Sequence, residues 1–566
     1  MILVLMAVAT TAIDVKLLDI QAVRSASYVR MAANQDVASV TLPALRGSIL
    51  ASNGAELALS ELRSLVFADP TEITNASAEA RRLGVVLGRP ASTIRSQLTA
   101  KTTYVVLAAG LSEQTGQRVA SLGLAGIGVQ HQAVRFHPAG GLAAPIVGGV
   151  NSAGLGYSGL EYAYNGMLAG RQGRLIARVD PQGQPVPGGV LVHQPALNGS
   201  DLLTTINEPL QYQAEQALRA AVVRTHATSG VAMVMDRRTG ALLAVADISS
   251  AHGGAAESPT AAAFTSVYEP GSVMKVVTVA GALAAGLIQP GTVLTIPPAL
   301  PVAGTLIRDA EQHPTEQLSI TGILAQSSNI GAAEIAGMLG PQRLYAEEAK
   351  FGFTRPTAVA FPGQSAGLVP TPSHFTGTTL ATMAFGEAQA DTPVQVLAAY
   401  NTIANGGVYV PPRLVTATIG PHGHEHLLPA TPPHRVVPRW VASAMTPMFE
   451  QVVSSGTGPN ASLAGYAVAG KTGTSNVVRP GGGYSASVTN STFVGYYPAQ
   501  HPSLTEIVVV NGSTLYGAQA AAPTFSKIAR DAVLDLRVPS AGPQPPPENT
   551  AVPTIAGRVD TALLGL

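Results

Sequence analysis

The sequence has no cysteine and little charge. Cys 0 among 566 residues excludes disulfides, thiolate metal sites and cysteine nucleophiles, and it leaves the redox compartment open. Only 12% of the residues are charged, and Lys+Arg 33 balances Asp+Glu 33. This balance gives no reason to expect a nucleic-acid partner. A hydrophobic content of 46%, with Gly 59 and Pro 42, is typical of a globular, turn-rich chain of two or three domains.

Long apolar runs are also missing. The N-terminal run, residues 1–13, is shorter than the ~20 residues that span a bilayer. It has neither the basic region nor the small-residue cleavage site of a signal peptide. We interpret residues 1–16 as the outer end of a membrane anchor that begins upstream, or as a short anchor, with a buried N-terminal helix as the alternative. Residues 17–35 predict a helix that leaves this anchor.

The first large module, residues 17–199, is broken by turn-rich segments with short β-like runs between them. We predict an elongated mixed module, the pedestal, without a titratable cluster of its own. An Asn-Gly-Ser-Asp sequence at 198–201 marks its end. A strand at 202–206 and a helix at 209–225 then open the second module, residues 200–538.

The second module has strands towards its two ends and a helical middle, residues 273–448. The predicted strands, beginning with a hairpin, are 231–235, 241–245, 466–471, 492–497 and 504–510. This order predicts an α+β domain in which an antiparallel sheet is flanked by helices. The tail, residues 539–566, is rich in proline and is predicted to be mobile.

Lysine is scarce. The chain has only Lys16, Lys101, Lys275, Lys350, Lys471 and Lys527. A Glu-Pro-Gly turn places Ser272 at a predicted helix start, with Lys275 one turn later on the same face. A serine hydroxyl attacks when a nearby base takes its proton, and a lysine with a lowered pKa can be that base. On its own, Ser-x-x-Lys better fits a capping serine and a solvated lysine.

Two further motifs change this interpretation. Lys471-Thr472-Gly473-Thr474 lies in an extended run, and an edge strand there could bind an extended peptide and direct an N–H at an oxyanion. Its glycines would let a ligand approach the strand closely. Ser327 and Asn329 form a small polar group in the apolar helical middle, which alone would indicate a helix cap. The order Ser-x-x-Lys, Ser-x-Asn, Lys-Thr-Gly makes coincidence a poor explanation.

This motif set resembles that of penicillin-binding proteins and serine β-lactamases. The stretch from Arg46 to Ala58 resembles the opening of the pedestal of class B penicillin-binding proteins. Later segments that resemble the same class are Gly159-Leu160-Glu161, 168–173, 392–395 and 404–407. The resemblance covers nearly the whole chain and is greatest to septal or elongation-type members.

Two positions depart from the family pattern. Ala51-Ser52 replaces the usual Asp-Arg pair, which leaves a salt-bridge network of the pedestal in question but not the chemistry. Phe385-Gly386-Glu387-Ala388 replaces a more usual Phe-Gly-Gln-Gly, so the cleft wall near Glu387 is expected to differ in charge and width.

The resemblance implies a role for each motif residue. Ser272 would be the acylated nucleophile and Lys275 its base. Ser327 would relay a proton to the leaving amine, and Asn329 would hold the substrate amide and Lys275. Lys471 would supply a positive potential that keeps Lys275 neutral and attracts the substrate carboxylate.

The other motif residues would bind substrate. Thr472 and Thr474, on either side of Gly473, would hold the carboxylate. The backbone N–H groups of Ser272 and Thr474 would form an oxyanion hole, in which each donor contributes about 3–4 kcal/mol in comparable sites. No metal or organic cofactor is implied, and the histidine-rich segment 422–426 is interpreted as a solvated loop.

The implied function is that of a D,D-transpeptidase in the bacterial cytoplasmic membrane, single-pass, with an extracytoplasmic catalytic domain. It would crosslink peptidoglycan stem peptides through a serine acyl-enzyme, release D-alanine and be inhibited covalently by β-lactams. The implied partners are a SEDS-type glycosyltransferase and other cell-wall synthesis proteins, serving cell division or cell shape. Two alternatives are a catalytically inactive penicillin-binding receptor or scaffold, against which the intact motifs argue, and a β-lactamase, against which the long pedestal argues.

Overall fold

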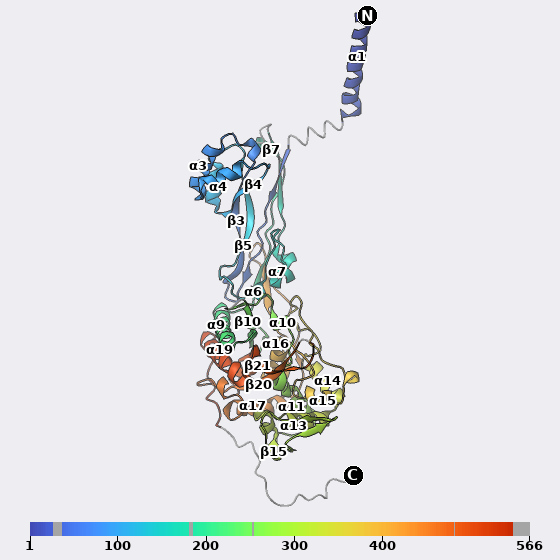
Figure 1. Ribbon diagram of the computed structural model, residues 1–566, viewed down its shortest axis with the longest axis vertical. Coiled ribbons are helices and arrows are strands. Elements are labelled where there is room, and N and C mark those ends of the chain that lie inside the picture. Colours follow the sequence, from blue (N-terminus) through green and yellow to red (C-terminus); the bar gives the residue numbers. More distant parts are fainter. Residues whose placement is uncertain (26–36, 180–184, 252–253, 480, 547–566) are drawn as a thin grey trace, which may run out of the picture.

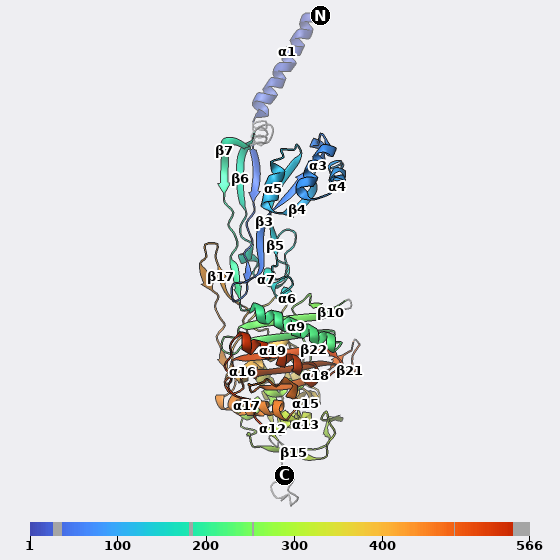
Figure 2. The same ribbon diagram turned by 90° about the vertical axis from the view of Figure 1, so that its left-hand side faces the viewer.

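The molecule is elongated, and its main parts follow each other along its long axis (Figure 1). The computed structural model describes residues 1–25, 37–179, 185–251, 254–479 and 481–546. A pedestal of long strands leads into a larger domain in which helices surround a sheet, as Figure 2 shows from the side. The predicted α+β architecture, a pedestal followed by an antiparallel sheet flanked by helices, is confirmed.

The N-terminal run forms helix α1 (Ile2–Leu18), which continues into a π-helical turn (Asp19–Val23). None of the side chains in α1 is buried. Over the described parts of the chain, no helix has both the length and the apolar character needed to cross a bilayer. The predicted helix over 17–35 is described only at its start, because 26–36 lie outside the described residues.

Strand β3 (Glu56–Ala68) is the backbone of the pedestal and pairs antiparallel with β5 (Ile127–Phe136). Its buried Val66 and Ala68 belong to a small hydrophobic core, to which α3 (Ala76–Leu87) and α4 (Ala91–Leu98) also contribute. The other strands are β1 (Val37–Leu42), β2 (Ile49–Leu50), β4 (Val105–Leu111), β6 (Gly173–Val179) and β7 (Pro185–Gln194). The helices are α3 (Ala76–Leu87), α4 (Ala91–Leu98), α5 (Glu113–Ala120), α6 (Ala144–Val147), α7 (Gly159–Ala163) and α8 (Asn165–Leu168).

A buried ionic cluster holds the base of the pedestal together. Glu161 is completely buried between two arginines, with Arg46 Nε 2.5 Å from one carboxylate oxygen and Arg135 Nη2 2.7 Å from the other. Arg46 also donates to Asn165 Oδ1 at 2.8 Å. The prediction of a pedestal without a titratable cluster is therefore wrong. The side chains of Ala51 and Ser52 take no part in this network, which joins Arg46 before β2, Arg135 on β5 and Glu161 in α7.

A second sheet crosses the predicted boundary at 199/200. Strand β8 (Asp201–Thr204) pairs in parallel with β2 of the pedestal and antiparallel with β17 (Val415–Ile419), which pairs in turn with β18 (Glu425–Leu427). Figure 2 shows β17 rising beside the pedestal. The histidine-rich segment predicted as a loop thus lies in an exposed hairpin, and part of it is strand.

The central sheet of the larger domain is entirely antiparallel, in the order β11-β10-β9-β22-β21-β20. Its strands are β9 (Ser229–Asp236), β10 (Leu242–Ala251), β11 (Gly254–Glu257), β20 (Ala469–Val478), β21 (Tyr484–Tyr497) and β22 (Leu504–Ser513). Chain segments from both ends of the module close this sheet, as predicted. The strand predicted at 466–471 is displaced, since β20 begins at Ala469 and extends to Val478.

Both faces of this sheet are buried, so its strands are apolar on both sides. On β9, Val231, Met233 and Met235 belong to one core, whereas Ala232 and Val234 belong to the other. Helices α9 (Glu208–Arg224) and α19 (Ala522–Asp535) cover the second face. The first face carries α11 (Lys275–Ala284), α16 (Pro393–Ala404) and α17 (Arg439–Ser454).

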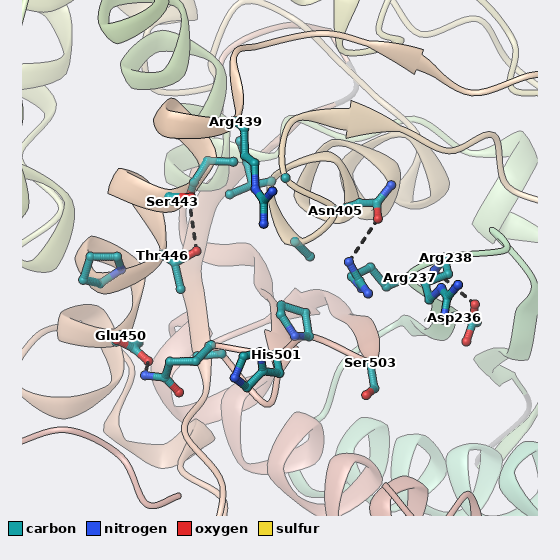
Figure 3. A pocket seen from close by; sticks show the side chains of 18 of the residues that line it. Asp236, Arg237, Arg238, Asn405, Arg439, Ser443, Thr446, Glu450, His501 and Ser503 are labelled. Carbon is teal, nitrogen blue, oxygen red and sulfur yellow. Dashed lines mark hydrogen bonds between the residues drawn. The ribbon is translucent and has the colours of Figure 1, made fainter. Parts of the chain in front are cut away.

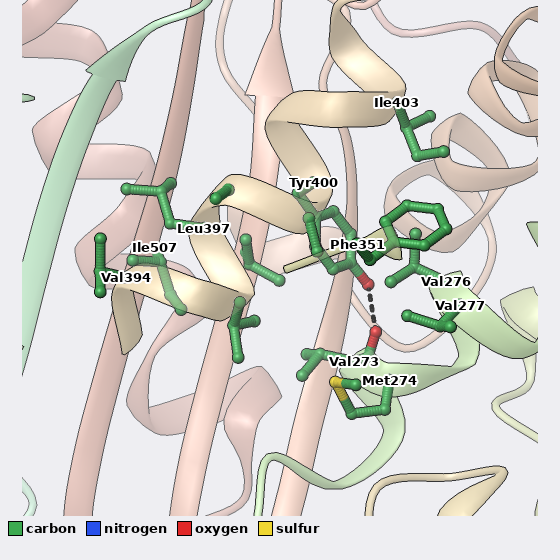
Figure 4. Close-up of a cluster of buried hydrophobic side chains, with 14 of the residues drawn as sticks. Val273, Met274, Val276, Val277, Phe351, Val394, Leu397, Tyr400, Ile403 and Ile507 are labelled. Carbon is green, nitrogen blue, oxygen red and sulfur yellow. Dashed lines mark hydrogen bonds between the residues drawn. The ribbon is translucent and has the colours of Figure 1, made fainter. Parts of the chain in front are cut away.

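Helix α16 connects this core to the start of α11. Tyr400 of α16 is fully buried, packs against Phe449 of α17 with ring centroids 5.4 Å apart, and donates a hydrogen bond to the Val273 carbonyl at 2.9 Å. Figure 4 shows this bond within the surrounding apolar cluster. This bond fixes the backbone of Val273, the residue after the predicted nucleophile Ser272, to the core.

The middle of the domain is less helical than predicted. Proline- and glycine-containing segments between its helices form three small antiparallel pairs. They are β12 (Val293–Ile296) with β15 (Glu316–Ser319), β13 (Leu300–Val302) with β14 (Thr305–Ile307), and β16 (Val408–Tyr409) with β19 (His434–Arg435). The remaining helices are α10 (Ala262–Thr265), α12 (Ile320–Ala325), α13 (Asn329–Leu339), α14 (Pro341–Lys350), α15 (Thr379–Met383) and α18 (Gly517–Ala520).

The start of the proline-rich tail is docked on this domain. Gln544 accepts a hydrogen bond from Val468 N at 2.7 Å and donates one to the Glu450 carbonyl at 2.9 Å. The prediction of a mobile tail is therefore wrong for residues 539–546. Residues 547–566 lie outside the described residues.

Candidate active site

Ser272 lies in a 3-10 turn, η3 (Gly271–Met274), that runs directly into α11. The turn is pressed against strand β20. Gly271 has a φ of +65°, and a Cβ there would lie 2.7 Å from the Thr474 carbonyl oxygen. Only glycine combines this backbone conformation with such a close approach. The predicted helix start at Ser272 is thus a tighter turn that precedes the helix.

The amine of Lys275 is the centre of the site. Its Nζ lies 2.9 Å from Ser272 Oγ, 3.2 Å from Ser327 Oγ and 2.8 Å from Asn329 Oδ1. It also donates to the Ser327 carbonyl at 2.6 Å. Lys275 is 0% exposed. The structure therefore brings together the first two motifs around one buried amine.

Backbone geometry explains how Ser327 and Asn329 both reach this amine. Ser327 has a φ of +63°, a left-handed conformation that non-glycine residues adopt only rarely. Ser328 between them caps α13, accepting a hydrogen bond from Gly331 N at 3.0 Å. The helix cap that was the alternative interpretation of this motif is thus present, and Ser328 forms it while Ser327 and Asn329 face Lys275.

Asp309 supports this loop and was not identified from the sequence. Its carboxylate accepts hydrogen bonds from Asn329 N at 2.5 Å, Ile330 N at 3.0 Å and Ser328 Oγ at 2.7 Å. His313 Nε2 lies 3.2 Å from the same carboxylate. Nothing in the local sequence signals this role, because Asp309 reaches α13 from a loop before β15.

The third motif lies on β20, the edge strand of the central sheet. Lys471 is 0% exposed, and its Nζ donates to the Thr472 carbonyl at 3.1 Å. Thr472 Oγ1 lies 2.6 Å from Thr457 Oγ1, another residue the sequence did not reveal. The Thr474 hydroxyl accepts a hydrogen bond from Gly517 N at 3.1 Å.

Gly473 serves a purpose different from the predicted one. A Cβ at this position would lie 2.6 Å from the Pro270 carbonyl oxygen and 2.9 Å from a Val273 methyl group. The missing side chain therefore allows η3 to pack on β20. This packing sets the position of Ser272 relative to the third motif.

Burial is the main electrostatic influence on the two lysines. It lowers the pKa of Lys275 to about 7, although the negative charges of Asp309 and Glu387 oppose the shift. Burial lowers the pKa of Lys471 well below its usual range, and the charge on Lys275 adds to that effect. The sequence analysis made Lys471 the cause of a neutral Lys275. In the structure, desolvation lowers the pKa of Lys275, and repulsion between the two amines further lowers the pKa of Lys471.

Two carboxylates line the site near Ser272. Glu269 Oε1 accepts hydrogen bonds from Ala388 N at 3.2 Å and from the Tyr484 hydroxyl at 3.0 Å. Burial raises the pKa of Glu387, and the charge of Glu269 raises it further. The unusual Glu387 thus adds a partly buried acid to the wall, and its charge acts on Lys275.

The chemistry that this arrangement can perform is acyl transfer. A lysine with a pKa of about 7 is partly neutral near neutral pH and can accept the proton of Ser272. Within the described residues, no group of three or more histidines and acidic side chains is placed to hold a metal ion.

The chain is similar to known proteins over most of its length. The model of the penicillin-binding protein transpeptidase domain matches residues 230–530, and that of the penicillin-binding protein dimerisation domain matches residues 41–204. Penicillin-binding protein PbpB of Mycolicibacterium smegmatis is 32% identical over 580 residues, covering 94% of this chain and 89% of the relative. Peptidoglycan D,D-transpeptidase FtsI of Escherichia coli K12 is 29% identical and covers 85% and 82%, respectively.

Solved structures give the same result. Penicillin-binding protein 3 from Mycobacterium tuberculosis, complexed with aztreonam, is similar with a TM-score of 0.71 and 28% sequence identity. The alignment covers 90% of this chain and 100% of that one.

Proposed function

Since this chain belongs to the class B penicillin-binding proteins, we infer that it is a serine-type peptidoglycan D,D-transpeptidase. It crosslinks stem peptides of peptidoglycan by acyl transfer and is acylated by β-lactams. The observation that carries this conclusion is the buried Lys275 amine, 2.9 Å from the Ser272 hydroxyl and within hydrogen-bond distance of Ser327 and Asn329.

In the first step, the neutral Lys275 amine takes the proton of Ser272 while Ser272 Oγ attacks the carbonyl carbon of the penultimate D-alanine. The N–H groups of Ser272 and Thr474 stabilise the oxyanion of the tetrahedral intermediate. The C–N bond then breaks, and the amine of the terminal D-alanine leaves with a proton that Lys275 returns through Ser327. An acyl-enzyme ester on Ser272 remains.

In the second step, the side-chain amine of a second stem peptide attacks this ester. Its proton passes to Lys275, the C–O bond to Ser272 breaks, and the serine regains its proton. Asn329 keeps the Lys275 amine in place, and the hydrogen bond that its Oδ1 accepts from Lys275 Nζ at 2.8 Å supports that role.

We assign Lys471 a role that depends on substrate. A substrate carboxylate held by Thr472 and Thr474 favours the protonated form of Lys471. That charge then disfavours a proton on Lys275, which therefore acts as a base once substrate has bound. The buried position of both amines supports this coupling.

We also propose that α1 is part of a single membrane anchor and that the catalytic domain lies outside the cytoplasmic membrane, where the substrate is. The apolar, unburied side chains of α1 support an apolar environment for it. A SEDS-type glycosyltransferase and other cell-wall synthesis proteins are the proposed partners. Depletion of the protein separates the two cellular roles, because filaments indicate division and rounded cells indicate elongation.

Labelled penicillin tests the function. We expect the protein to be labelled and the label to decay slowly, whereas rapid turnover would indicate a β-lactamase and no label an inactive scaffold. Ser272→Ala should remove the label and leave the fold intact, with the exposed Ser487→Ala as the control. Lys275→Arg should also prevent labelling by penicillin, because a guanidinium stays protonated and cannot accept the proton of Ser272. Lys527→Arg on the surface should be labelled normally. Retained labelling in Ser272→Ala would overturn the assignment of the nucleophile.

A further inference from the structure

A separate cavity of about 980 Å³ lies at one end of the central sheet. Its walls are the β9–β10 turn, the C-terminal end of α16, the first turns of α17 and the β21–β22 connection. Its described lining contains none of the residues of the three motifs. Figure 3 shows the side chains of Arg237 and Arg439 reaching into this space from different elements.

Four arginines line the cavity, although the chain as a whole is poor in charge. They come from the β9–β10 turn, from β19 and from the start of α17, and are Arg237, Arg238, Arg435 and Arg439. Among the described residues, none of them forms an ion pair with a carboxylate. Arg238, Arg435 and Arg439 are exposed and Arg237 is half-buried, so together they give this space a positive potential that attracts an anion.

Arg237 shows an unused donor directly. One of its terminal nitrogens donates to Asn405 Oδ1 at 3.1 Å. Its Nε is shielded from solvent and has no hydrogen-bond partner among the described residues. Burial and the neighbouring Arg238 lower its pKa, while the charge of Asp236 opposes the shift. Buried donors without partners are rare in folded proteins, so this one requires an explanation.

The two acidic residues of the lining do not supply the missing partner. Asp236 accepts hydrogen bonds within its own turn, from Arg238 N at 3.1 Å, Thr239 N at 2.8 Å and Thr239 Oγ1 at 2.7 Å. Glu450 is buried and accepts a hydrogen bond from Gln500. Four guanidinium groups against two engaged carboxylates leave the cavity with an excess of positive charge.

The shape and remaining walls of the cavity restrict the ligand. Its volume is in the range of sites that enclose small organic molecules, well above what a single inorganic ion needs. Ile403, Ala442, Pro447 and Pro502 give it an apolar side. Guanidinium groups match the oxygens of phosphate in pairs, and a phosphate monoester carries about −1.5 to −2 at neutral pH.

We propose that this cavity binds a phosphate ester, whose phosphate lies between Arg237 and Arg439 and whose organic part lies against the apolar side. Such a ligand accepts hydrogen bonds from the terminal guanidinium nitrogens of Arg237 and Arg439 and balances the charge of the arginine cluster. This site is distinct from the site of acylation and requires no change in the reaction described above.

Titration calorimetry of the whole protein with pyrophosphate tests the proposal, with citrate as a carboxylate anion at matched ionic strength. We expect saturable pyrophosphate binding, at least about tenfold weaker in Arg439→Gln, and citrate binding at least about tenfold weaker than pyrophosphate. Arg439 is exposed and makes no side-chain hydrogen bond to the described residues, so its replacement should leave the fold intact. Arg95→Gln, an exposed pedestal arginine, is the matched control for charge.

Penicillin labelling verifies that each variant is folded, because these arginines lie outside the catalytic machinery. Arg237→Gln should weaken the binding of pyrophosphate as Arg439→Gln does. If Arg237→Gln does not fold, the affinity of Arg439→Gln alone decides the proposal. The absence of saturable binding, an equal loss in Arg95→Gln or equally tight citrate binding would each overturn the proposal.

Discussion

The rate of acylation should report the protonation state of Lys275. Burial lowers the pKa of this amine to about 7, and only its neutral form accepts the proton of Ser272. The neutral fraction is about one tenth at about pH 6 and about nine tenths at about pH 8. The rate should therefore rise about tenfold over this interval and then level off. A lysine with an ordinary pKa near 10.4 would give a rise of about a hundredfold and no plateau.

The assay is the second-order rate constant of acylation by a β-lactam that does not itself titrate in this range. Circular dichroism at each pH separates loss of the base from loss of the fold. Lys527→Arg serves as the control, because its changed side chain is exposed and far from the reaction. A rate that keeps rising beyond about pH 9, or one that does not change with pH, would refute the argument that burial creates the base.

Three substitutions extend this reasoning. Glu387→Gln removes a negative charge that raises the pKa of Lys275, so the acid limb of the pH–rate profile should move to lower pH, and an unchanged or higher limb would contradict this. Glu161→Gln leaves two buried arginines without their counter-charge and should lower the free energy of unfolding by about 3–5 kcal/mol in urea titrations. Gly271→Ala places a Cβ 2.7 Å from a β20 carbonyl and should slow acylation more than about tenfold, whereas Gly166→Ala, with open space around it, should label at the normal rate.

The sequence was informative where function depends on neighbours along the chain. Ser272 and Lys275 are one helical turn apart, and the hairpin of β9 and β10 is encoded by its own turn. For such elements, local periodicity and turn residues are sufficient. The structure accordingly places the motif amine beside the motif hydroxyl.

Residues that act across the fold left no such signal. Asp309 holds the loop of Ser327 and Asn329 through backbone N–H groups, and Thr457 meets Thr472 through tertiary packing alone. The sequence indicated that the pKa of Lys275 is lowered but not the main cause, because desolvation depends on the complete burial of the amine. Gly473 illustrates the same limit: its pattern suggested space for a ligand, but the space is filled by the Pro270 carbonyl.

The sheet that joins β2 and β3 to β8 and β17 gives the molecule mechanical continuity. A load applied to the pedestal is carried into the catalytic domain by rows of backbone hydrogen bonds and not by a flexible linker. The buried ion pairs of Glu161 with Arg46 and Arg135 hold the segments at the same junction together. The pedestal should therefore act as a stiff extension of the catalytic domain, so that the two parts move together.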